Sequence, residues 1–599
     1  MRTMQVLIGF RQLFLGALVA CTALVGCERF DLEGAGDGAD AGEARNEDRV
    51  PAGPMAGIGG DAGGSTSIDC GDRDRSAATV ISGSVRGESI WSGLIVIEGE
   101  VEVVADAVTI EPGTTVLMTA GSSIVFSASS QETKLLAKGS AASPIRFCGE
   151  SGEPGTWAFV RFDDTMAPGS ELSHVLFSDG GRDGAAVDFG GGVWVNDVQI
   201  RNTLGVGFVA SSFGSGSAAL TVAGAGAAAG RLIESNAITN FPLGGNLSEN
   251  QHPFMEVSVA SIRRDTVFHD IGVPYHQIEP TVEVNDVEVV FEAGVEYRAG
   301  VGADGSARLV FGANSQPTRL VVGGTSERPV IFRGFEEAPG FWRGIQILDA
   351  VRTDSVIEHA YIRHGGGAGP AMSVASPITL KHVRMEDNQA GMALNRRGLS
   401  SASEDLVITR TSGRPLHVDP GALRTLPSGS FVGNADDVIE VAGGNLGVGT
   451  IPDPGVPFFV EGDIGQEDGD VEIAAGVHFV MQRDTIFSVG LYSGTRFRAV
   501  ATAEAPIVFS GAEAEPGFWR GLLVQSSSGP CDFEFVEVSD GGGQGACMEI
   551  DTLRSISILH STFRNCAGYG VGKSTTDQND YTVGNTFAAN ELGAMGVVD

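Results

Sequence analysis

The chain has 599 residues, of which 19% are charged and 42% are hydrophobic, and its formal net charge is −36 at pH 7. This acidic balance disfavours nucleic acid and anionic lipid as partners, because both carry negative charge. The length exceeds that of one ordinary domain, and the 86 glycines predict a chain with many tight turns.

The amino terminus predicts export and lipidation. Arg2 and Arg11 flank a short apolar run that continues into Leu24-Val25-Gly26-Cys27. The run is too short and too early for a membrane-spanning helix. The segment resembles a bacterial lipoprotein signal, which implies removal of residues 1–26 and acylation of Cys27. The alternative is an ordinary secretory signal in which Cys27 has no special role.

Residues 27–75 are rich in Gly, Ala and acidic side chains and have few large apolar ones. Such a segment buries too little apolar surface to fold, so we expect a flexible tether. With acyl chains on Cys27, the tether would hold the rest of the chain near a membrane that it does not span. The expected location is the bacterial cell envelope, on the outer membrane, facing either the periplasm or the outside.

One block then occurs three times, at residues 144–162, 329–347 and 506–524, each with the same frame of Pro, Phe, Pro-Gly and Trp. The tryptophans of the block, Trp157, Trp342 and Trp519, are 185 and 177 residues apart. Because ordinary solenoid repeats span roughly 20 to 50 residues, each copy should contain several smaller units.

Inside each copy the sequence predicts short β-strands. Runs of three to six residues rich in Val, Ile and Phe are separated by Gly, Asp, Asn, Ser or Pro. No stretch sustains a helical apolar period, so long helices are not expected. The expected strands include Val101–Val104, Val108–Ile110, Ile345–Leu348, Ile378–Leu380, Phe533–Val538 and Ile556–Leu559. Such spacing suits an all-β sandwich or a solenoid. The solenoid is favoured because Val538-Ser-Asp recurs in character 25 residues later, at Phe563-Arg-Asn.

At these residues the chain resembles the right-handed parallel β-helix family, the pectate-lyase-like superfold, and in particular its bacterial secreted members with repeated PIxF and PGxWxGI motifs. The resemblance covers roughly residues 80–599 and implies an all-β solenoid with three short strands in each coil. We divide it into three homologous segments, residues 76–240, 241–430 and 431–599. The alternative is one unbroken rod.

The cysteine count fits an exported protein. Cys21 leaves with the signal and Cys27 takes lipid, so five of the seven cysteines remain: Cys70, Cys148, Cys531, Cys547 and Cys566. Cys531 and Cys547 stand where the first two copies have Ser and Ala, which predicts a disulfide between them. The alternative is two unrelated buried thiols. A pair of Cys70 with Cys148 would fasten the end of the tether to the first copy.

Enzymes of the superfold that cleave acidic polysaccharides use acidic clusters with Arg or Lys, because hydrolysis needs a proton donor and an activated water. The best acidic cluster here is Asp163, Asp164, Asp179 and Asp183. The more conservative interpretation is a solvated turn in an acidic protein. The sequence has no Asp-x-Asp-x-Asp-Gly loop and no Cys-x-x-Cys pair, so no metal site or cofactor is predicted. Calcium is compatible with the acidic surface alone.

The residues shared by the copies have structural explanations. The three tryptophans follow Pro-Gly and should pack at a corner, with a carbohydrate-stacking platform as the alternative. His174 and His359 align with Phe535, which favours packing over metal binding. Asn202, Asp387 and Asn565 suit a polar stack at a corner, because short polar side chains bond to the backbone there and tolerate left-handed conformations.

Two functions from different classes remain. The favoured one is a non-catalytic, lipid-anchored protein at the cell surface that binds a glycan or a protein, or serves as a spacer or adhesin. The alternative is a polysaccharide lyase or glycoside hydrolase acting on an acidic polysaccharide. The absence of the family's catalytic motifs favours the first.

Overall fold

The computed structural model describes residues 70–71, 75–128, 131–300, 307–467, 469–490, 495–525, 529–551 and 555–598. The predicted signal, Cys27 and nearly all of the predicted tether lie outside these residues. Contacts group Ser67–Asp599 into one compact unit. Within its described residues, this unit is all-β apart from one short α-helix, α1 (Ser235–Thr239), and short 3-10 turns.

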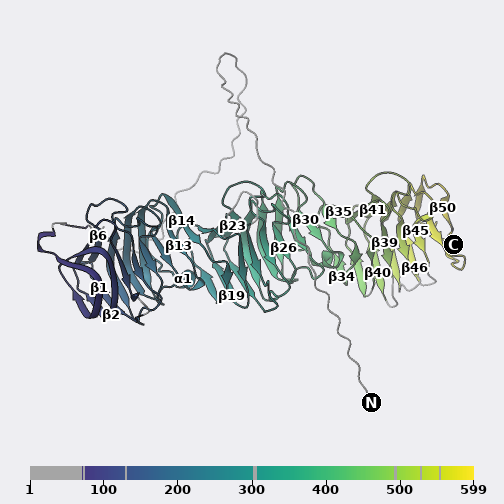
Figure 1. Cartoon of the computed structure of the whole chain (residues 1–599). Coiled ribbons are helices and arrows are strands. Elements are labelled where there is room, and N and C mark those ends of the chain that lie inside the picture. The colour runs from purple at the N-terminus through teal and green to yellow at the C-terminus, as the bar shows by residue number, and fades with distance from the viewer. Residues whose placement is uncertain are drawn as a thin grey trace, which may run out of the picture. The chain divides into compact units, whose positions relative to one another are not determined.

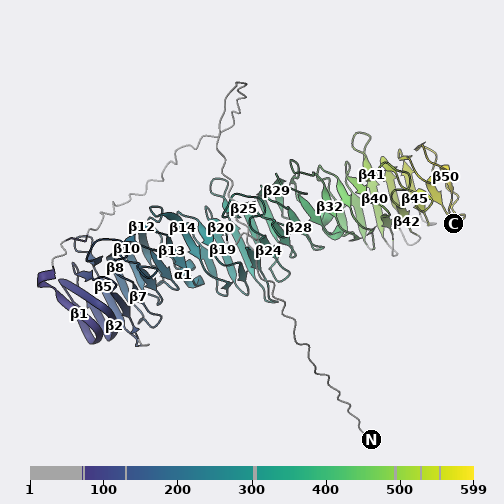
Figure 2. The same ribbon diagram turned by 45° about the horizontal axis from the view of Figure 1, so that its top comes forward.

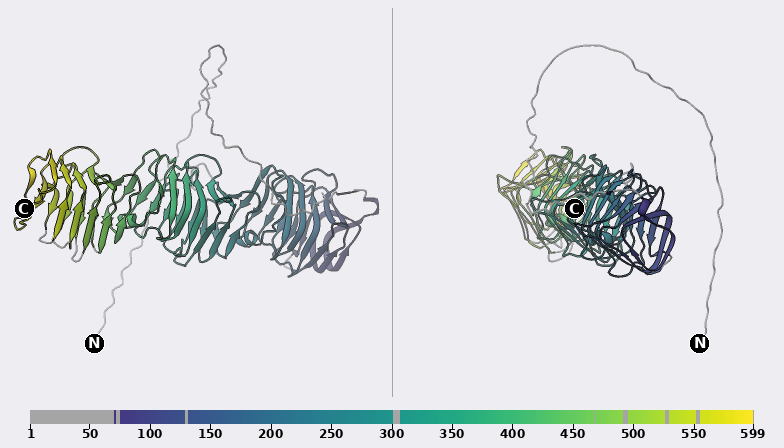
Figure 3. Two further views of the ribbon diagram at one scale, coloured as in Figure 1. Left: turned by 180° about the vertical axis from the view of Figure 1, so that it is seen from behind. Right: turned by 90° about the vertical axis from the view of Figure 1, so that its left-hand side faces the viewer.

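The paired strands are parallel and form sheets of 24, 14, 7 and 5 strands. Figure 1 shows the strands stacked in chain order from β1 (Thr79–Trp91) to β50 (Gly593–Val597). The tilted view in Figure 2 and the reverse view in Figure 3 show the same order. Parallel strands of this kind lie about 4.8 Å apart and need a crossover between neighbours. The unit is therefore a parallel β-solenoid, in agreement with the expected all-β solenoid architecture.

The strands that matter below come from three regions. The first region contains β2 (Leu94–Ile110), β3 (Thr115–Met118), β6 (Ile145–Gly149), β7 (Val160–Phe162), β8 (Glu171–Ser178), β9 (Val187–Phe189), β10 (Trp194–Thr203) and β12 (Ala218–Ala225). The second contains β23 (Val330–Gly334), β24 (Gly344–Ile347), β25 (Val356–Arg363), β27 (Thr379–Glu386) and β29 (Glu404–Thr409). The third contains β41 (Ile507–Gly511), β43 (Cys531–Glu534), β44 (Val536–Ser539), β45 (Ala546–Ile550), β46 (Ile556–Leu559), β47 (Thr562–Arg564) and β48 (Tyr569–Lys573).

The alternation of apolar and polar residues determines which side chains face the interior. In β25, Ile357, Ala360 and Ile362 are buried, whereas Tyr361 and Arg363 lie on the outer face. Identical positions of successive coils stack, so aromatic rings form columns inside the unit. Phe458, Phe479 and Phe509 form one column, with centroid distances of 5.3 and 5.2 Å. Each such pair adds about 0.5 to 1.5 kcal/mol beyond the burial of its area.

The predicted strands are present with two changes. Val101–Val104 and Val108–Ile110 fall within the single long strand β2. Phe533–Val538 is divided into β43 and β44, because Phe535 has φ = 52° and turns the chain. The expected coil repeat is also correct, since Val538 of β44 pairs with Phe563 of β47.

The predicted disulfide between Cys531 and Cys547 is wrong. Cys547 is bonded to Cys566 instead. The other pair considered, Cys70 with Cys148, is present as a disulfide. Cys531 is buried, and its Sγ lies 3.6 Å from the carbonyl oxygen of Gly529. The strands β43, β45 and β47 belong to three different sheets. Cys566 directly follows β47, and the next residue, Ala567, donates its N–H to the Gly541 carbonyl oxygen at 3.0 Å, in the chain that leads into β45. Aligning copies shows which positions are equivalent but not which ones are neighbours.

Candidate functional site

Two rows of residues with left-handed backbone run along the stack. The first row, which we call the bend ladder, lies where β8, β10, β25, β27 and their equivalents turn from one face to the next. Its members occupy equivalent places in successive coils and have φ between 47° and 57°: His174, Asp197 and Ala219; His359, His382 and Asp405; Phe535 and His560. The second row, the corner ladder, lies just beyond the ends of the same strands: Asp179 and Asn202; His364, Asp387 and Arg410; Asp540, Asn565 and Ala589.

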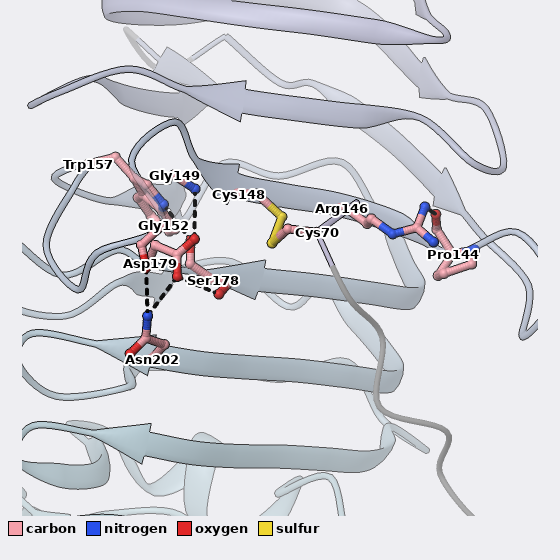
Figure 4. Close-up of a disulfide and its surroundings, with 10 residues drawn as sticks. All are labelled: Cys70, Pro144, Arg146, Cys148, Gly149, Gly152, Trp157, Ser178, Asp179 and Asn202. Carbon is pink, nitrogen blue, oxygen red and sulfur yellow. Dashed lines mark hydrogen bonds between the residues drawn. A yellow bond between two sulfur atoms is a disulfide. The ribbon is translucent and has the colours of Figure 1, made fainter. Parts of the chain in front are cut away.

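The buried aspartates of the corner ladder each accept several hydrogen bonds. The Asp179 carboxylate is 2% exposed and accepts bonds from the Gly149 N–H at 3.2 Å, the Ser178 hydroxyl at 2.8 Å and the Asn202 amide at 2.8 Å. Figure 4 shows these bonds converging at the end of the strand that carries Cys148. Asp540 accepts equivalent bonds from Ser539 and Asn565, both at 2.7 Å. Such buried and hydrogen-bonded carboxylates hold the corner together.

The three repeated tryptophans complete the same corners. The indole N–H groups of Trp157, Trp342 and Trp519 donate to the carbonyl oxygens of the residues before the corner, Ser178, Arg363 and Ser539, at 2.7, 2.7 and 2.8 Å. The three rings are fully buried, so they do not offer an exposed surface for stacking a sugar. Gly180 must be glycine, because a Cβ there would lie 2.5 Å from the Trp157 ring.

The bend ladder is more open, and its second group carries the best candidate site. The rings of His359 and His382 are stacked with centroids 4.5 Å apart, and His382 Nδ1 lies 2.9 Å from Asp405 Oδ2. The side chains of His382 and Asp405 are 41% and 47% exposed. Asp405 orients the His382 ring and leaves the other ring nitrogen facing away from this bond.

A hollow of about 260 Å³ opens beside these rings. The segment from Thr325 to Pro329 forms one wall, and Tyr361 and Arg384, which are partners in the register of β25 and β27, form another. Most arginines on this face have acidic partners; Arg363, for example, pairs with Glu386 at 2.8 Å. Arg384 is exposed and has no ion pair with any described residue. The Arg363 guanidinium lies over one face of the Tyr361 ring, 4.7 Å from its centroid, and the two histidine rings cover one face of each other. The hollow thus combines the remaining aromatic faces with a carboxylate and with the Arg384 guanidinium, which has no ion pair among the described residues.

This combination is suited to binding a sugar ring. Aromatic faces pack against the apolar face of a ring, Asp405 accepts hydrogen bonds from hydroxyl groups, and Arg384 donates to hydroxyl or carboxylate oxygens. The volume lies near the lower end of ligand pockets, which suits one sugar residue of a longer chain. The hydroxyl of Ser326 already donates a hydrogen bond to Glu327 at 2.7 Å, so this part of the wall is less available to a ligand.

The structure does not bring the four predicted aspartates together. Asp179 is committed to the sealed corner, whereas Asp164 and Asp183 are exposed. Asp163 lies after β7, where its Oδ1 accepts the Asp164 N–H at 2.9 Å. Asp163 also lies near Asp188 of β9; burial raises the pKa of that carboxyl, and the charge of Asp163 raises it further. The hypothesis of an acidic catalytic cluster at these four residues therefore lacks the required geometry.

Sequence reasoning missed His382, Asp405, Tyr361 and Arg384. Of the histidines and aspartates here, it considered only His359, and as a packing residue. The signal that finds the site is an offset of one coil: His359, His382 and Asp405 follow one another at intervals of 23 residues.

Within the described residues, no group of three or more His, Cys, Asp or Glu side chains is arranged to hold a metal ion. A search of the same residues for helices long and apolar enough to cross a membrane finds none. Comparisons with models of known protein families, with curated proteins and with solved structures find no match.

Proposed function

We propose that this chain is a lipid-anchored protein of the bacterial cell envelope that binds a glycan without cleaving it. The observation that carries the binding role is the hollow at His359, His382, Tyr361 and Arg384, where aromatic faces meet an unpaired cation and an exposed carboxylate. The lipid anchor is proposed from Leu24–Cys27 alone. Cys27 would carry the acyl chains, and residues 28–69 would link them to the solenoid.

We further infer that the solenoid is a right-handed, pectate-lyase-like β-helix built from three homologous segments, residues 76–240, 241–430 and 431–599. The equivalent bonds of Trp157, Trp342 and Trp519 support this division, because the same indole closes the same corner in each segment. The binding hollow falls in the second segment, where the bend ladder carries two histidines. Function would then lie where the segments differ.

An array of neutral and acidic glycans tests the binding role. Arg384→Ala and His382→Ala should each weaken binding of a retained glycan by about tenfold, equivalent to about 1.4 kcal/mol. Arg182→Ala is the matched control, since Arg182 is also an exposed arginine that lines a different hollow. A lack of binding across the array, or equal losses in all three variants, would contradict the proposal.

The anchor has a separate test. Cells supplied with labelled palmitate should label the wild-type protein and leave Cys27→Ser unlabelled, with the variant released from the membrane fraction. Protease added to intact cells would show which side of the outer membrane the protein faces. Labelling that persists in the variant would contradict the assignment of Cys27.

The alternative function is a polysaccharide lyase or hydrolase acting on an acidic polysaccharide. One observation favours it: the His382 and Asp405 pair lies beside Tyr361 and Arg384, and such a set can move a proton while holding a carboxylate. New reducing ends or unsaturated products from uronate polymers would establish it. That activity should be lost in Tyr361→Phe if Tyr361 transfers the proton.

A further inference from the structure

The disulfide between Cys70 and Cys148 is placed at the point where any tension from the amino-terminal side enters the solenoid. Cys148 lies in β6, which pairs with β3 on one side and with β8 on the other. In contrast, β1 pairs only with β2 among the described strands. Without the disulfide, tension would reach β1 first and peel it from the end of the stack, one pair of hydrogen bonds at a time.

The disulfide lies on the outer face of the sheet rather than in the main interior. Phe147 and Phe177 point into the core, whereas Cys148 and its neighbour Leu176 point the other way and are covered by Cys70. Cys148 and Leu176 are 0% and 1% exposed, and Cys70 is 6% exposed. Figure 4 shows the bond joining the incoming chain at Cys70 to the strand at Cys148. The incoming segment is thereby held against the side of a strand that is paired on both edges.

We propose that this disulfide is a mechanical staple, which passes tension on the amino-terminal segment directly to β6 and shields the coils between Cys70 and Cys148. The idea rests on the proposed lipid anchor only for the source of the tension. With the bond closed, load enters at Cys148, which must be sheared from two neighbouring strands at once. The loop that the disulfide closes, with a sequence separation of 78, carries no load and corresponds to about 270 Å of extended chain.

Force spectroscopy tests the staple without a membrane. The full chain is pulled between its amino-terminal segment and a short ligation tag inserted after Gly244, which lies in an exposed turn. For the oxidised wild-type protein we expect the first unfolding event at a force at least twofold higher than for Cys70→Ser, and no early extension of about 270 Å. Reduction of the wild-type protein should reproduce the behaviour of Cys70→Ser.

The matched control is the double variant Cys547→Ser with Cys566→Ser. It removes the other disulfide, which lies outside the pulled part of the chain, and should leave the first event unchanged. Equal first forces for oxidised wild type and Cys70→Ser would overturn the proposal, as would a control that weakens as much as Cys70→Ser. Neither result depends on palmitate labelling, so failure of the staple and failure of the anchor are distinguishable.

Discussion

The corner ladder and the bend ladder share one backbone conformation but differ in what surrounds it. His174 lies in β8 and Asp179 directly follows that strand, and their φ values are 49° and 71°. Asp179 is buried under three hydrogen bonds, whereas the side chain of His174 is 28% exposed and its Nδ1 lies 2.6 Å from Asp197 Oδ2. Left-handed backbone at a non-glycine residue costs of order 1 to 3 kcal/mol, which the surrounding structure must offset.

The difference indicates which positions are fixed by the fold. At Asp179 and Asp540 of the corner ladder, the buried carboxylate itself supplies the offset through its hydrogen bonds, so the residue type is constrained at these two positions. In the bend ladder the parallel strands on both sides impose the turn, and the outward side chain is free to vary between His, Asp, Ala and Phe. A binding site therefore develops more readily along the bend ladder, and the candidate hollow lies there.

Asp179→Ala should show the largest difference in stability between the two ladders. The substitution leaves the N–H of Gly149 without its side-chain acceptor and leaves the Asn202 amide with only the Gly152 carbonyl oxygen, at 3.2 Å, so we expect a loss of about 3 kcal/mol of stability. His174→Ala, in the strand that ends just before Asp179 and also with left-handed backbone, should cost less than about 1 kcal/mol, because its contact with Asp197 is partly exposed. Urea unfolding measures both, and equal costs would mean that the two ladders do not differ.

Trp157→Phe should cause the next largest loss of stability. Loss of the indole N–H leaves the Ser178 carbonyl buried without its partner and opens a small cavity, at a cost of about 2 kcal/mol. Trp194→Phe is the matched control, since Trp194 makes a similar bond to Gly216 at an exposed position. We expect less than about 1 kcal/mol there by the same measurement. A larger loss of stability in Trp194→Phe than in Trp157→Phe would contradict the structural role assigned to Trp157.

The fold was predictable because its signals are local and repeated. Strand length, turn residues and the offset between Val538 and Phe563 all follow from placing one coil on the next. The division of Phe533–Val538 was not predictable from propensity, because Phe disfavours left-handed backbone and Phe535 adopts it only under tertiary packing. Similarly, the three tryptophans could be assigned to corners, but not the carbonyl oxygens to which they donate.

The candidate site was harder to predict, because its residues come from separate coils. Tyr361 and Arg384 are ordinary outward residues of two strands, and only the register of β25 with β27 makes them neighbours. The disulfide prediction was wrong for the same reason. Cys547 and Cys566 are neighbours because successive coils stack, and an alignment of the three copies carries no information on that stacking. Searching for residues offset by one coil would have recovered Tyr361 with Arg384, but not the disulfide, because its cysteines are 19 residues apart and strand partners beside Cys547, such as Met548 and Val571, are one full coil apart.

The corner at His364 should differ from the corners at Asp179 and Asp540 in how its stability depends on pH. His364 stands where Asp179 and Asp540 stand, is buried, and has no hydrogen-bond partner for Nδ1 among the described residues. Burial lowers its pKa, and the charge of Arg333 lowers it further. The unfolded chain then binds the proton more readily, so stability is full above about pH 6.5 and falls as pH drops towards the folded pKa. In His364→Asn this fall should be smaller, and parallel stability curves for the two proteins would contradict the assignment.

The smallest expected effect compares two aspartates one coil apart in the two ladders. Asp387 accepts two bonds from Arg410, at 2.8 and 2.9 Å, and these bonds lower its pKa. Its stabilisation is therefore present above about pH 3.8 and is lost as pH falls through the folded pKa. Because the pair is largely exposed, Asp387→Asn should cost only about 1 kcal/mol at pH 7, and Asp405→Asn less than about 0.5 kcal/mol. Asp405→Asn should nevertheless weaken glycan binding severalfold, since Asp405 orients His382. If both variants lost stability and glycan binding to the same extent, the bend ladder would stabilise the fold as much as the corner ladder does, and the proposed difference between the two would be wrong.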